Sequence, residues 1–203
     1  MKVLVACEFS GIVRDAFIAH GHDAISCDLL PTERPGPHYQ GDVLNLLSEP
    51  WDMIVAFPPC THLSSSGAQY WKQKQADGRQ QEAIDFVMAI WQADAPFIAI
   101  ENPTGILSTV FSKPTQVINP FQFGEPYTKR TCLWLKNLPP LIPTNVVEPK
   151  YRWTSNSYHG GLKKDGTRTR SKLPVQKPWD TGHERSKSFQ GIADAMAEQW
   201  GRL

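Results

Sequence analysis

The chain has 203 residues, of which 40% are hydrophobic, and this is enough to bury the core of one domain but short of two. The net charge of +1 excludes a protein that is basic throughout, so a contact with nucleic acid has to come from a local patch. The four cysteines stand far apart, no stretch has the roughly 18 apolar residues of a membrane span, and the first residues lack the apolar region of a signal peptide. We therefore expect a single cytoplasmic domain, residues 1–203, without a metal and without membrane contact.

The first 30 residues predict a strand, a turn, a helix and a second strand. Residues 2–7 form a continuous apolar run, typical of a central parallel strand, and residues 12–20 have the pattern of an amphipathic helix. The glycine-containing turn between them, residues 8–11, either is purely structural or directs N–H groups at the helix start toward an anionic ligand. The second strand, residues 23–30, carries Asp28 near its end, where Rossmann-like folds hold ribose hydroxyls.

An apolar strand at residues 54–57 runs directly into Pro58-Pro59-Cys60. Two prolines end the strand and fix the next side chain in a rigid loop at its carboxyl end, where open α/β sheets bind ligands. A cysteine in such a polar loop is placed like a nucleophile, whereas a cysteine in a core is inert. The tripeptide alone leaves both interpretations open.

Two acids stand at other predicted element ends. Asp42 precedes a short helix and fits an N-cap, a role that is compatible with a ligand contact. Glu101 follows the apolar strand at residues 97–100, which comes after a long helix at residues 79–92, so it reaches the same sheet edge as Cys60. A buried acid at such an edge is uncommon without a function, and we interpret Glu101 as a site residue.

The remaining strands are predicted at residues 117–123 and 131–135, and residues 188–200 predict a terminal helix with one strongly apolar face. Lys129 and Arg130 stand just before the second of these strands. They fit either a solvated turn or contacts to phosphate and carboxylate groups at the active edge.

A basic, loop-rich segment at residues 144–183 interrupts this pattern. It holds eight Lys or Arg against three Asp or Glu, so its net charge is +5 and that of the rest of the chain is −4. Aromatic residues interleaved with basic ones suit nucleic acid, by stacking and phosphate contact, although a solvated face has the same composition. The candidate phosphate contacts in this segment are Lys163, Lys164, Arg168 and Arg170.

Taken in order, these segments resemble the motifs of the DNA (cytosine-5-)-methyltransferases, and most closely the short, phage-type branch of that family. The matching segments are FSGIVRDAF, the acid after the second strand, GDV, FPPC, ENP, KRTCLWL and FQGIADAMAEQWG. The resemblance spares residues 144–183, which stand where the family has a large target-recognition domain. It implies an α/β, Rossmann-like, S-adenosylmethionine-dependent methyltransferase fold, with a mostly parallel sheet and helices on both faces.

The resemblance also implies the reaction, which is methylation of carbon 5 of cytosine in duplex or single-stranded DNA. Cys60 matches the nucleophile that adds to carbon 6, Glu101 matches the acid that holds the ring nitrogen and exocyclic amine, and Arg130 matches a family arginine. The S-adenosylmethionine contacts that we expect are Glu8, Phe9, Ser10, Gly11, Asp28, Leu29, Asp42 and Pro58. The DNA contacts that we expect are Lys129, Lys163, Lys164, Arg168 and Arg170.

Three other interpretations fit parts of the sequence. A methyltransferase that acts on an exocyclic amino group also uses a Pro-Pro loop, but it needs no cysteine there. A catalytically idle methylase-like protein that only binds DNA has no use for Cys60 and Glu101 together. A nucleotide or a single strand as substrate is favoured by the missing recognition domain. Restriction–modification and protection of phage DNA are the biological roles that the resemblance implies.

Overall fold

The described part of the chain builds one seven-stranded sheet and a separate pair of short strands. This computed structural model describes residues 1–153, 173–175 and 182–203. The strands of the sheet are β1 (Lys2–Ala6), β2 (Asp23–Asp28), β3 (His38–Gln40), β4 (Met53–Ala56), β5 (Phe97–Pro103), β6 (Gln116–Ile118) and β8 (Thr131–Lys136). The pair consists of β7 (Tyr127–Thr128) and β9 (Tyr151–Arg152).

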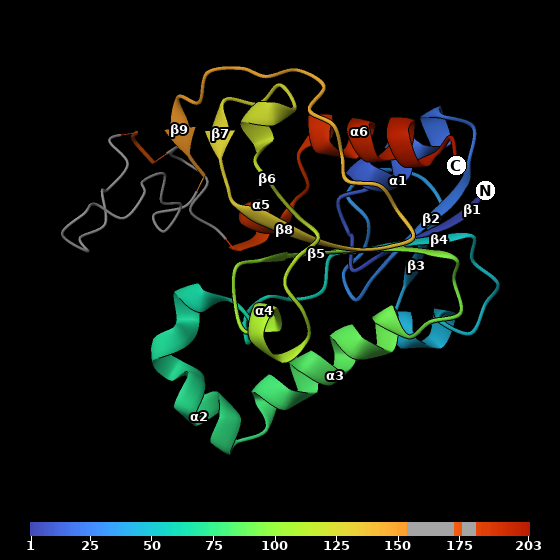
Figure 1. Ribbon diagram of the computed structural model, residues 1–203. Coiled ribbons are helices and arrows are strands. Elements are labelled where there is room, and N and C mark those ends of the chain that lie inside the picture. Colours follow the sequence, from blue (N-terminus) through green and yellow to red (C-terminus); the bar gives the residue numbers. More distant parts are fainter. Residues whose placement is uncertain (154–172, 176–181) are drawn as a thin grey trace.

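The strands of the sheet follow the order β3-β2-β1-β4-β5-β8-β6 (Figure 1). Neighbouring strands from β3 to β5 are parallel, whereas β8 is antiparallel to both β5 and β6. The parallel part has the strand order of a doubly wound sheet, in which the chain direction across the sheet reverses beside β1. This arrangement confirms the predicted α/β class, a Rossmann-like fold with a mostly parallel sheet.

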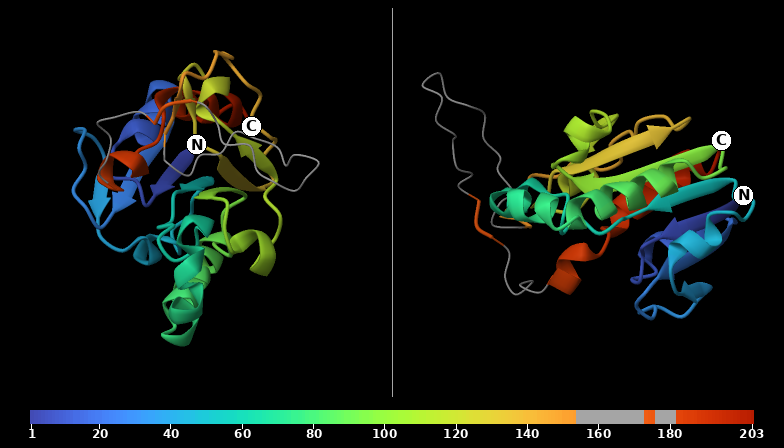
Figure 2. Two further views of the ribbon diagram at one scale, coloured as in Figure 1. Left: turned by 90° about the vertical axis from the view of Figure 1, so that its left-hand side faces the viewer. Right: turned by 90° about the horizontal axis from the view of Figure 1, so that it is seen from below.

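Helices cover both faces of this sheet, as predicted (Figure 1). α1 (Ile12–Ala19) and α6 (Gln190–Trp200) pack on one face, and α3 (Arg79–Trp91) and α4 (Leu107–Val110) pack on the other. The left view of Figure 2 shows the same two layers from the side, with α1 and α6 (blue and red) above the sheet and α3 (green) below it. The remaining helices are short: η1 (Val43–Leu46), η2 (Ser65–Tyr70), α2 (Trp71–Ala76), η3 (Pro120–Gln122) and α5 (Gly182–Ser186).

The core explains the unbroken apolar pattern of the central strands. Along β1, Val3 and Val5 join the apolar cluster beneath α1 and α6, while Leu4 and Ala6 join the cluster beneath α3. Successive side chains of a strand point to opposite faces, and both faces here are covered. A parallel strand buried on both sides therefore reads as a continuous apolar run, as residues 2–7 do.

The strand predicted at residues 117–123 is wrong beyond Ile118. The backbone N–H of Asn119 is bound by the side chain of Gln122, and Pro120 starts the helix η3. Proline has no N–H to give to a strand ladder but fits the first position of a helix. The other predicted helices and strands are present, with ends that differ by one to a few residues.

Most of the basic segment at residues 144–183 lies outside the described residues. This holds for Lys163, Lys164, Arg168 and Arg170, the four candidate phosphate contacts. In the described parts of this segment, β9 pairs with β7, and Trp153 packs with Tyr127 and Phe189.

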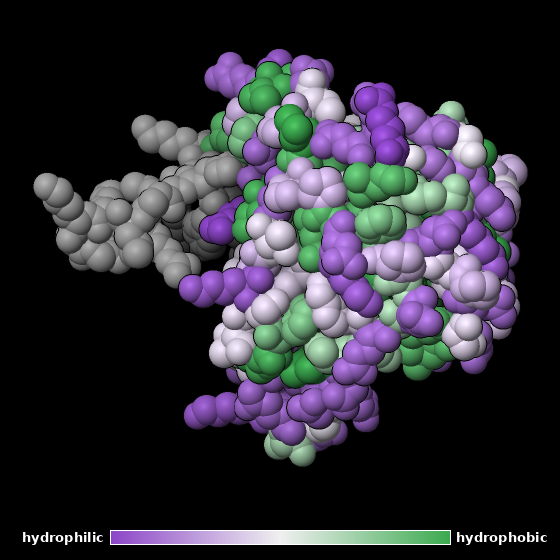
Figure 3. All heavy atoms as spheres, turned by 45° about the vertical axis from the view of Figure 1, so that its right-hand side comes forward, coloured by the Kyte–Doolittle hydropathy of each residue, from purple (hydrophilic) through white to green (hydrophobic). Residues whose placement is uncertain are grey.

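No helix among the described residues is long and apolar enough to cross a membrane. The exposed large hydrophobic side chains, such as Leu29, Tyr70 and Ile142, come from separate segments of the chain. On the face that Figure 3 presents, hydrophobic residues form small groups between hydrophilic ones.

Candidate active site

The candidate site lies where four parallel strands end side by side. Ala6 of β1 is in register with Cys27 of β2 and with Ala56 of β4, and Ala56 is in register with Ile100 of β5. β1 and β4 end at these positions and β2 ends one residue later, while β5 continues to Pro103 beside β8, so the carboxyl ends of all four strands lie at one edge of the sheet. This is the edge, beside the point where strand order reverses, at which open α/β sheets bind ligands.

Cys60 lies on the loop after β4, and hydrogen bonds hold this loop before and after the cysteine. The side-chain amide of Asn102 donates to the carbonyl of Pro58 at 2.9 Å. After the cysteine, the N–H groups of Leu63 and Ser64 donate to the carbonyl of Cys60 at 3.0 and 2.9 Å. Cys60 itself is exposed, which excludes the interpretation of this residue as a small core hydrophobe.

Glu101 lies within β5 rather than after it, and it shares the site edge with Cys60. Burial raises the pKa of the Glu101 carboxyl, while the charge of Lys129 and a hydrogen bond from Thr131 oppose this rise. A carboxyl with a raised pKa retains a proton more readily and can act as a donor. Glu101 is thus suited to donate a hydrogen bond from its protonated carboxyl to a ligand.

The Cys60 thiol is not a preformed thiolate. Although Cys60 as a residue is exposed, the protein groups packed around its thiol partly replace water and raise its pKa, and the nearby Glu101 raises it further. Lys129 and Lys74 act in the opposite direction and lower it. The sulfur is therefore protonated at neutral pH in the absence of a ligand, and the balance of these charges sets how readily it ionises.

Lys129 and Arg130 occupy different environments. Arg130 is exposed, whereas Lys129 is half-buried, with its ammonium 5.8 Å from the ring centre of Phe189 and 3.5 Å from the carbonyl oxygen of Arg185. Lys129 is also the base that acts on the pKa values of Glu101 and Cys60. From the sequence we expected Arg130 to accompany Cys60 and Glu101, and Lys129 to contact DNA. In the structure Lys129 is the basic residue whose charge acts on Cys60 and Glu101.

The turn after β1 is built around a buried carboxylate. Glu8 accepts a hydrogen bond from the N–H of Ile12 at 2.8 Å and another from the hydroxyl of Ser10, so it caps the start of α1. Gly11 has a φ of +75°, and a Cβ there would lie 2.5 Å from the Arg14 guanidinium. The contacts of Glu8, Ser10 and Gly11 within the turn therefore fix its conformation. A ligand at this turn would contact mainly backbone atoms of the turn.

A pocket of about 340 Å³ opens at the ends of β1 and β2. This volume lies within the range of small-molecule sites, roughly 300–1,000 Å³. Of the predicted cofactor residues, Asp28, Leu29 and Asp42 line the pocket, and Pro59 lines it in place of the predicted Pro58. The other lining residues are Cys7, Cys27, Gly41, Val43, His62, Arg79, Glu82, Ala83 and Phe86.

Asp28 and Asp42, two of the three acids that line this pocket, each accept a backbone hydrogen bond with one carboxylate oxygen. Asp28 accepts from the N–H of Leu30 at 2.9 Å, and Asp42 accepts from the N–H of Leu44 at 3.0 Å as the N-cap of η1. The predicted capping role of Asp42 is thereby confirmed. A carboxylate has several acceptor positions, so both acids keep capacity for hydroxyl or amine donors of a ligand.

Phe86 of α3 and Val43 of η1 supply the apolar walls of the pocket. The sequence pattern marks Phe86 only as part of the apolar face of a helix and does not show that it reaches a cavity. A pocket lined by apolar and aromatic side chains together with carboxylates suits the base and ribose of a nucleoside.

A second, much smaller cavity of about 20 Å³ lies beside Glu101. Phe57, Lys129 and Phe189 are among its walls, together with residues 186–188. This volume holds about one water molecule, so a larger group can reach Glu101 here only after these walls move.

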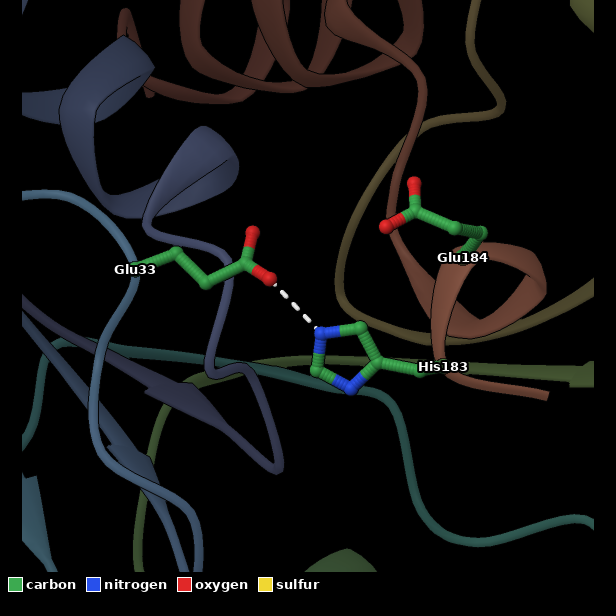
Figure 4. Close-up of side chains that lie close together, drawn as sticks. All are labelled: Glu33, His183 and Glu184. Atoms are coloured by element: carbon green, nitrogen blue, oxygen red, sulfur yellow. Dashed lines mark hydrogen bonds and ion pairs between the residues drawn. The ribbon is translucent and has the colours of Figure 1, made fainter. Parts of the chain in front are cut away.

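Figure 4 shows Glu33, from the loop after β2, directed at His183 of α5, with Glu184 close by. The Nε2 atom of His183 lies 2.7 Å from a carboxylate oxygen of Glu33. The ammonium of Lys187 lies 2.9 Å from a carboxylate oxygen of Glu33 and 2.8 Å from one of Glu184, so it forms an ion pair with both acids. We interpret this cluster as an ion-pair network that fastens α5 over Phe9, whose ring centre lies 4.4 Å from that of His183.

No protein-family model matches the chain, and no curated protein is similar to it. Among solved structures, the chain is similar to an E. coli protein described as a "putative DNA modification methyltransferase" encoded within a prophage. The similarity has a TM-score of 0.46 and 16% identity, and it covers 72% of this chain and 51% of that chain. The chain thus spans about half the length of that protein.

Proposed function

We propose that the protein methylates carbon 5 of cytosine in DNA, with S-adenosylmethionine as the methyl donor. The observation that carries this proposal is the exposed Cys60, held in a Pro-Pro loop beside the carboxyl of Glu101. A binding protein has no need for a thiol at this edge, and a methyltransferase for amino groups has no need for a sulfur nucleophile.

In the proposed reaction the sulfur of Cys60 adds to carbon 6 of cytosine. Glu101 holds the ring nitrogen and the exocyclic amine, and its raised pKa lets it donate a proton to that nitrogen as the carbon–sulfur bond forms. Carbon 5 would then act as an enamine-like nucleophile and form a bond to the methyl group as the bond between that methyl group and the sulfonium of S-adenosylmethionine breaks, with S-adenosylhomocysteine as the leaving group. Transfer of the carbon 5 proton to a base such as water, together with cleavage of the bond between carbon 6 and sulfur, would restore the ring and free Cys60 as a thiolate.

The residues of the 340 Å³ pocket fit S-adenosylmethionine. Asp28 would accept from the ribose hydroxyls and Asp42 from the adenine amine, while Phe86 would contact the base. The turn with Phe9, Ser10 and Gly11 would face the methionine end. When bound, this cofactor supplies an electrophilic methyl group.

DNA is the substrate class that we propose, with the target base flipped out of the helix because a stacked base cannot reach the site edge. The cavity beside Glu101 holds about one water, so entry of a base requires the wall at residues 186–189 to shift. Lys129 and the four basic residues outside the described part of the chain are the proposed phosphate contacts.

The test is transfer of a labelled methyl group to duplex and single-stranded DNA, followed by separation of the nucleosides. We expect the label in 5-methylcytosine, and we expect Cys60→Ser to lower the rate by at least about 10³-fold while S-adenosylmethionine still binds. Label on an exocyclic nitrogen would show amino-group chemistry. No transfer by a preparation that binds both DNA and S-adenosylmethionine would favour the idle binding protein.

A second measurement tests the covalent step. DNA that carries 5-fluorocytosine should form a stable adduct with the wild-type protein in the presence of S-adenosylmethionine, because fluorine blocks the elimination that frees Cys60. The same incubation with Cys60→Ser provides the control. An active enzyme that forms no adduct contradicts the sulfur mechanism.

A further inference from the structure

The turn after Cys60 is held by two helices that come later in the chain. Lys74 of α2 donates from its ammonium to the carbonyl of Thr61 at 2.6 Å. Gln80, in the first turn of α3, donates from its amide to the carbonyl of His62 at 3.1 Å. The two carbonyls that follow the cysteine are therefore each bound by a side chain from outside the loop.

Lysine is an unusual residue for donating a hydrogen bond to the Thr61 carbonyl here, because Lys74 is only 9% exposed. Among the described residues, no carboxylate lies within ion-pairing distance of its ammonium. A buried ammonium without an acidic partner is costly, whereas a neutral amide such as that of Gln80 could make the same kind of bond. The positive charge itself therefore calls for an explanation.

Three charged groups act on the thiol of Cys60 among the described residues. They are Glu101 of β5, Lys129 between β7 and β8, and Lys74 of α2. Exclusion from water raises the pKa of the thiol most and Glu101 raises it further, whereas Lys129 lowers it and Lys74 lowers it by a smaller amount. Lys129 also lowers the pKa of the Glu101 carboxyl, whereas Lys74 is not among the groups that shift it. Of the two lysines, Lys74 therefore acts on Cys60 alone.

We propose that Lys74 is a positioning residue for Cys60: its ammonium fixes the turn that follows the cysteine and supplies positive charge to the surroundings of the thiol. This inference rests on the proposed role of Cys60 as the nucleophile. Gln80 shares the first task and, being neutral, cannot perform the second.

The test measures alkylation of Cys60 by iodoacetamide between about pH 6 and pH 10, because the rate reports the fraction of thiolate that attacks carbon and releases iodide. Mass spectrometry of the peptide that contains Cys60 gives the rate. For Lys74→Met we expect the rate near neutral pH to fall about three- to tenfold and the midpoint of the pH profile to rise. Lys74→Arg should restore most of the rate, and the matched control Lys72→Met, on the same helix, should leave rate and midpoint unchanged.

Gln80→Met separates the charge from the geometry, since it removes the other clamp without changing a charge. We expect its midpoint to match that of the wild type. An unchanged midpoint in Lys74→Met, or an equal rise in Gln80→Met, would overturn the proposal. Thermal unfolding shows whether each variant is folded, and if Lys74→Met is not, Lys74→Gln takes its place with the same expected rise.

This experiment needs neither DNA nor S-adenosylmethionine. If wild-type protein fails to transfer a methyl group but Lys74→Met still shifts the alkylation profile, then the proposed function falls and the action of Lys74 on Cys60 stands. If methyl transfer succeeds and Lys74→Met does not shift the alkylation profile, then the proposed function stands and the proposed action of Lys74 on Cys60 falls.

Discussion

The amide of Asn102 and the carbonyl of Pro58 join two neighbouring strand ends through a hydrogen bond of 2.9 Å. Asn102 is 1% exposed and lies next to Glu101 on β5, while Pro58 stands two residues before Cys60 on the loop after β4. One bond thus ties the segment that carries the acid to the segment that carries the thiol.

Asn102→Ala should therefore lower both stability and activity. Loss of this buried bond leaves the Pro58 carbonyl without its donor, at a cost of about 1–3 kcal/mol in the free energy of unfolding. We expect kcat to fall at least about tenfold as well, because small displacements of reacting groups are costly. Urea unfolding and methyl-transfer kinetics measure the two effects.

A matched control for Asn102 exists elsewhere in the chain. Asn137 donates to the carbonyl of Pro96 at 2.9 Å, but at an exposed position away from the site edge and with a φ of +57°. Asn137→Gly removes this bond and suits the left-handed backbone. It should leave kcat unchanged, and an equal loss of kcat in both variants would contradict the assigned role of Asn102.

Asp28→Ala should weaken the binding of S-adenosylmethionine by about ten- to a hundredfold, the range expected for losing a hydrogen bond to a charged acceptor. Calorimetry measures the dissociation constant. Asp23→Ala, at the other end of β2, is the control and should bind like the wild type. An unchanged dissociation constant for Asp28→Ala would contradict the contact with the cofactor. The hydrogen bond from the N–H of Leu30 would then be the role of Asp28.

Arg14→Met should lower the free energy of unfolding by about 1–3 kcal/mol, because it leaves the backbone carbonyls that the buried guanidinium binds without their donor. The Arg14 guanidinium binds Asp15 and reaches the backbone carbonyls of Arg34 and Pro35 at 3.1 and 3.3 Å. Arg34→Met changes a side chain that is largely exposed and keeps the carbonyl, so its cost should stay below about 1 kcal/mol. Similar costs for both variants would contradict this account.

The sequence predicts the elements of the site edge well because each depends on local chemistry. Prolines end β4 before Cys60, an apolar run delivers Glu101, and Asp42 has the residue type of an N-cap. Parallel strands in register then place these residues together without any further information. The prediction that Glu101 reaches the same sheet edge as Cys60 needed only that the strands before them be parallel members of one sheet.

The partners that come from distant segments could not be predicted in this way. Arg14 is a charged residue in an amphipathic helix, and only the loop after β2 explains its burial. Residues 64–67 have the composition of a polar loop, yet they begin η2, which leads Lys74 back to the Cys60 turn. Lys129 and Arg130 are adjacent, and no local pattern shows which of the two turns toward Glu101.

Glu101→Gln should change how stability depends on pH. The folded state raises the pKa of Glu101 above its ordinary value of 4.5, so the folded protein holds this proton more tightly than the unfolded chain. The resulting stability is complete below pH 4.5 and is lost as the pH rises through the folded-state pKa. Glutamine has no proton to lose, so the variant should gain stability relative to the wild type across that interval.

Urea unfolding at several pH values measures this difference. Glu198→Gln, in a half-exposed ion pair with Arg202, is the control and should show no such gain. Parallel curves for Glu101→Gln and the wild type would contradict the raised pKa of Glu101.

The last prediction concerns Lys163, Lys164, Arg168 and Arg170. If these residues contact phosphates, changing all four to Ala should flatten the dependence of log affinity on log salt by about three units, because each contact contributes roughly −0.9 on duplex and −0.7 on single strands. Binding to both kinds of DNA at several salt concentrations measures the slopes. A double variant of Lys2→Ala and Arg202→Ala, near the two chain ends, removes half as many charges and shows how much the slope changes from lost net charge alone. An unchanged slope in the fourfold variant would assign DNA capture to other basic groups, such as Lys129.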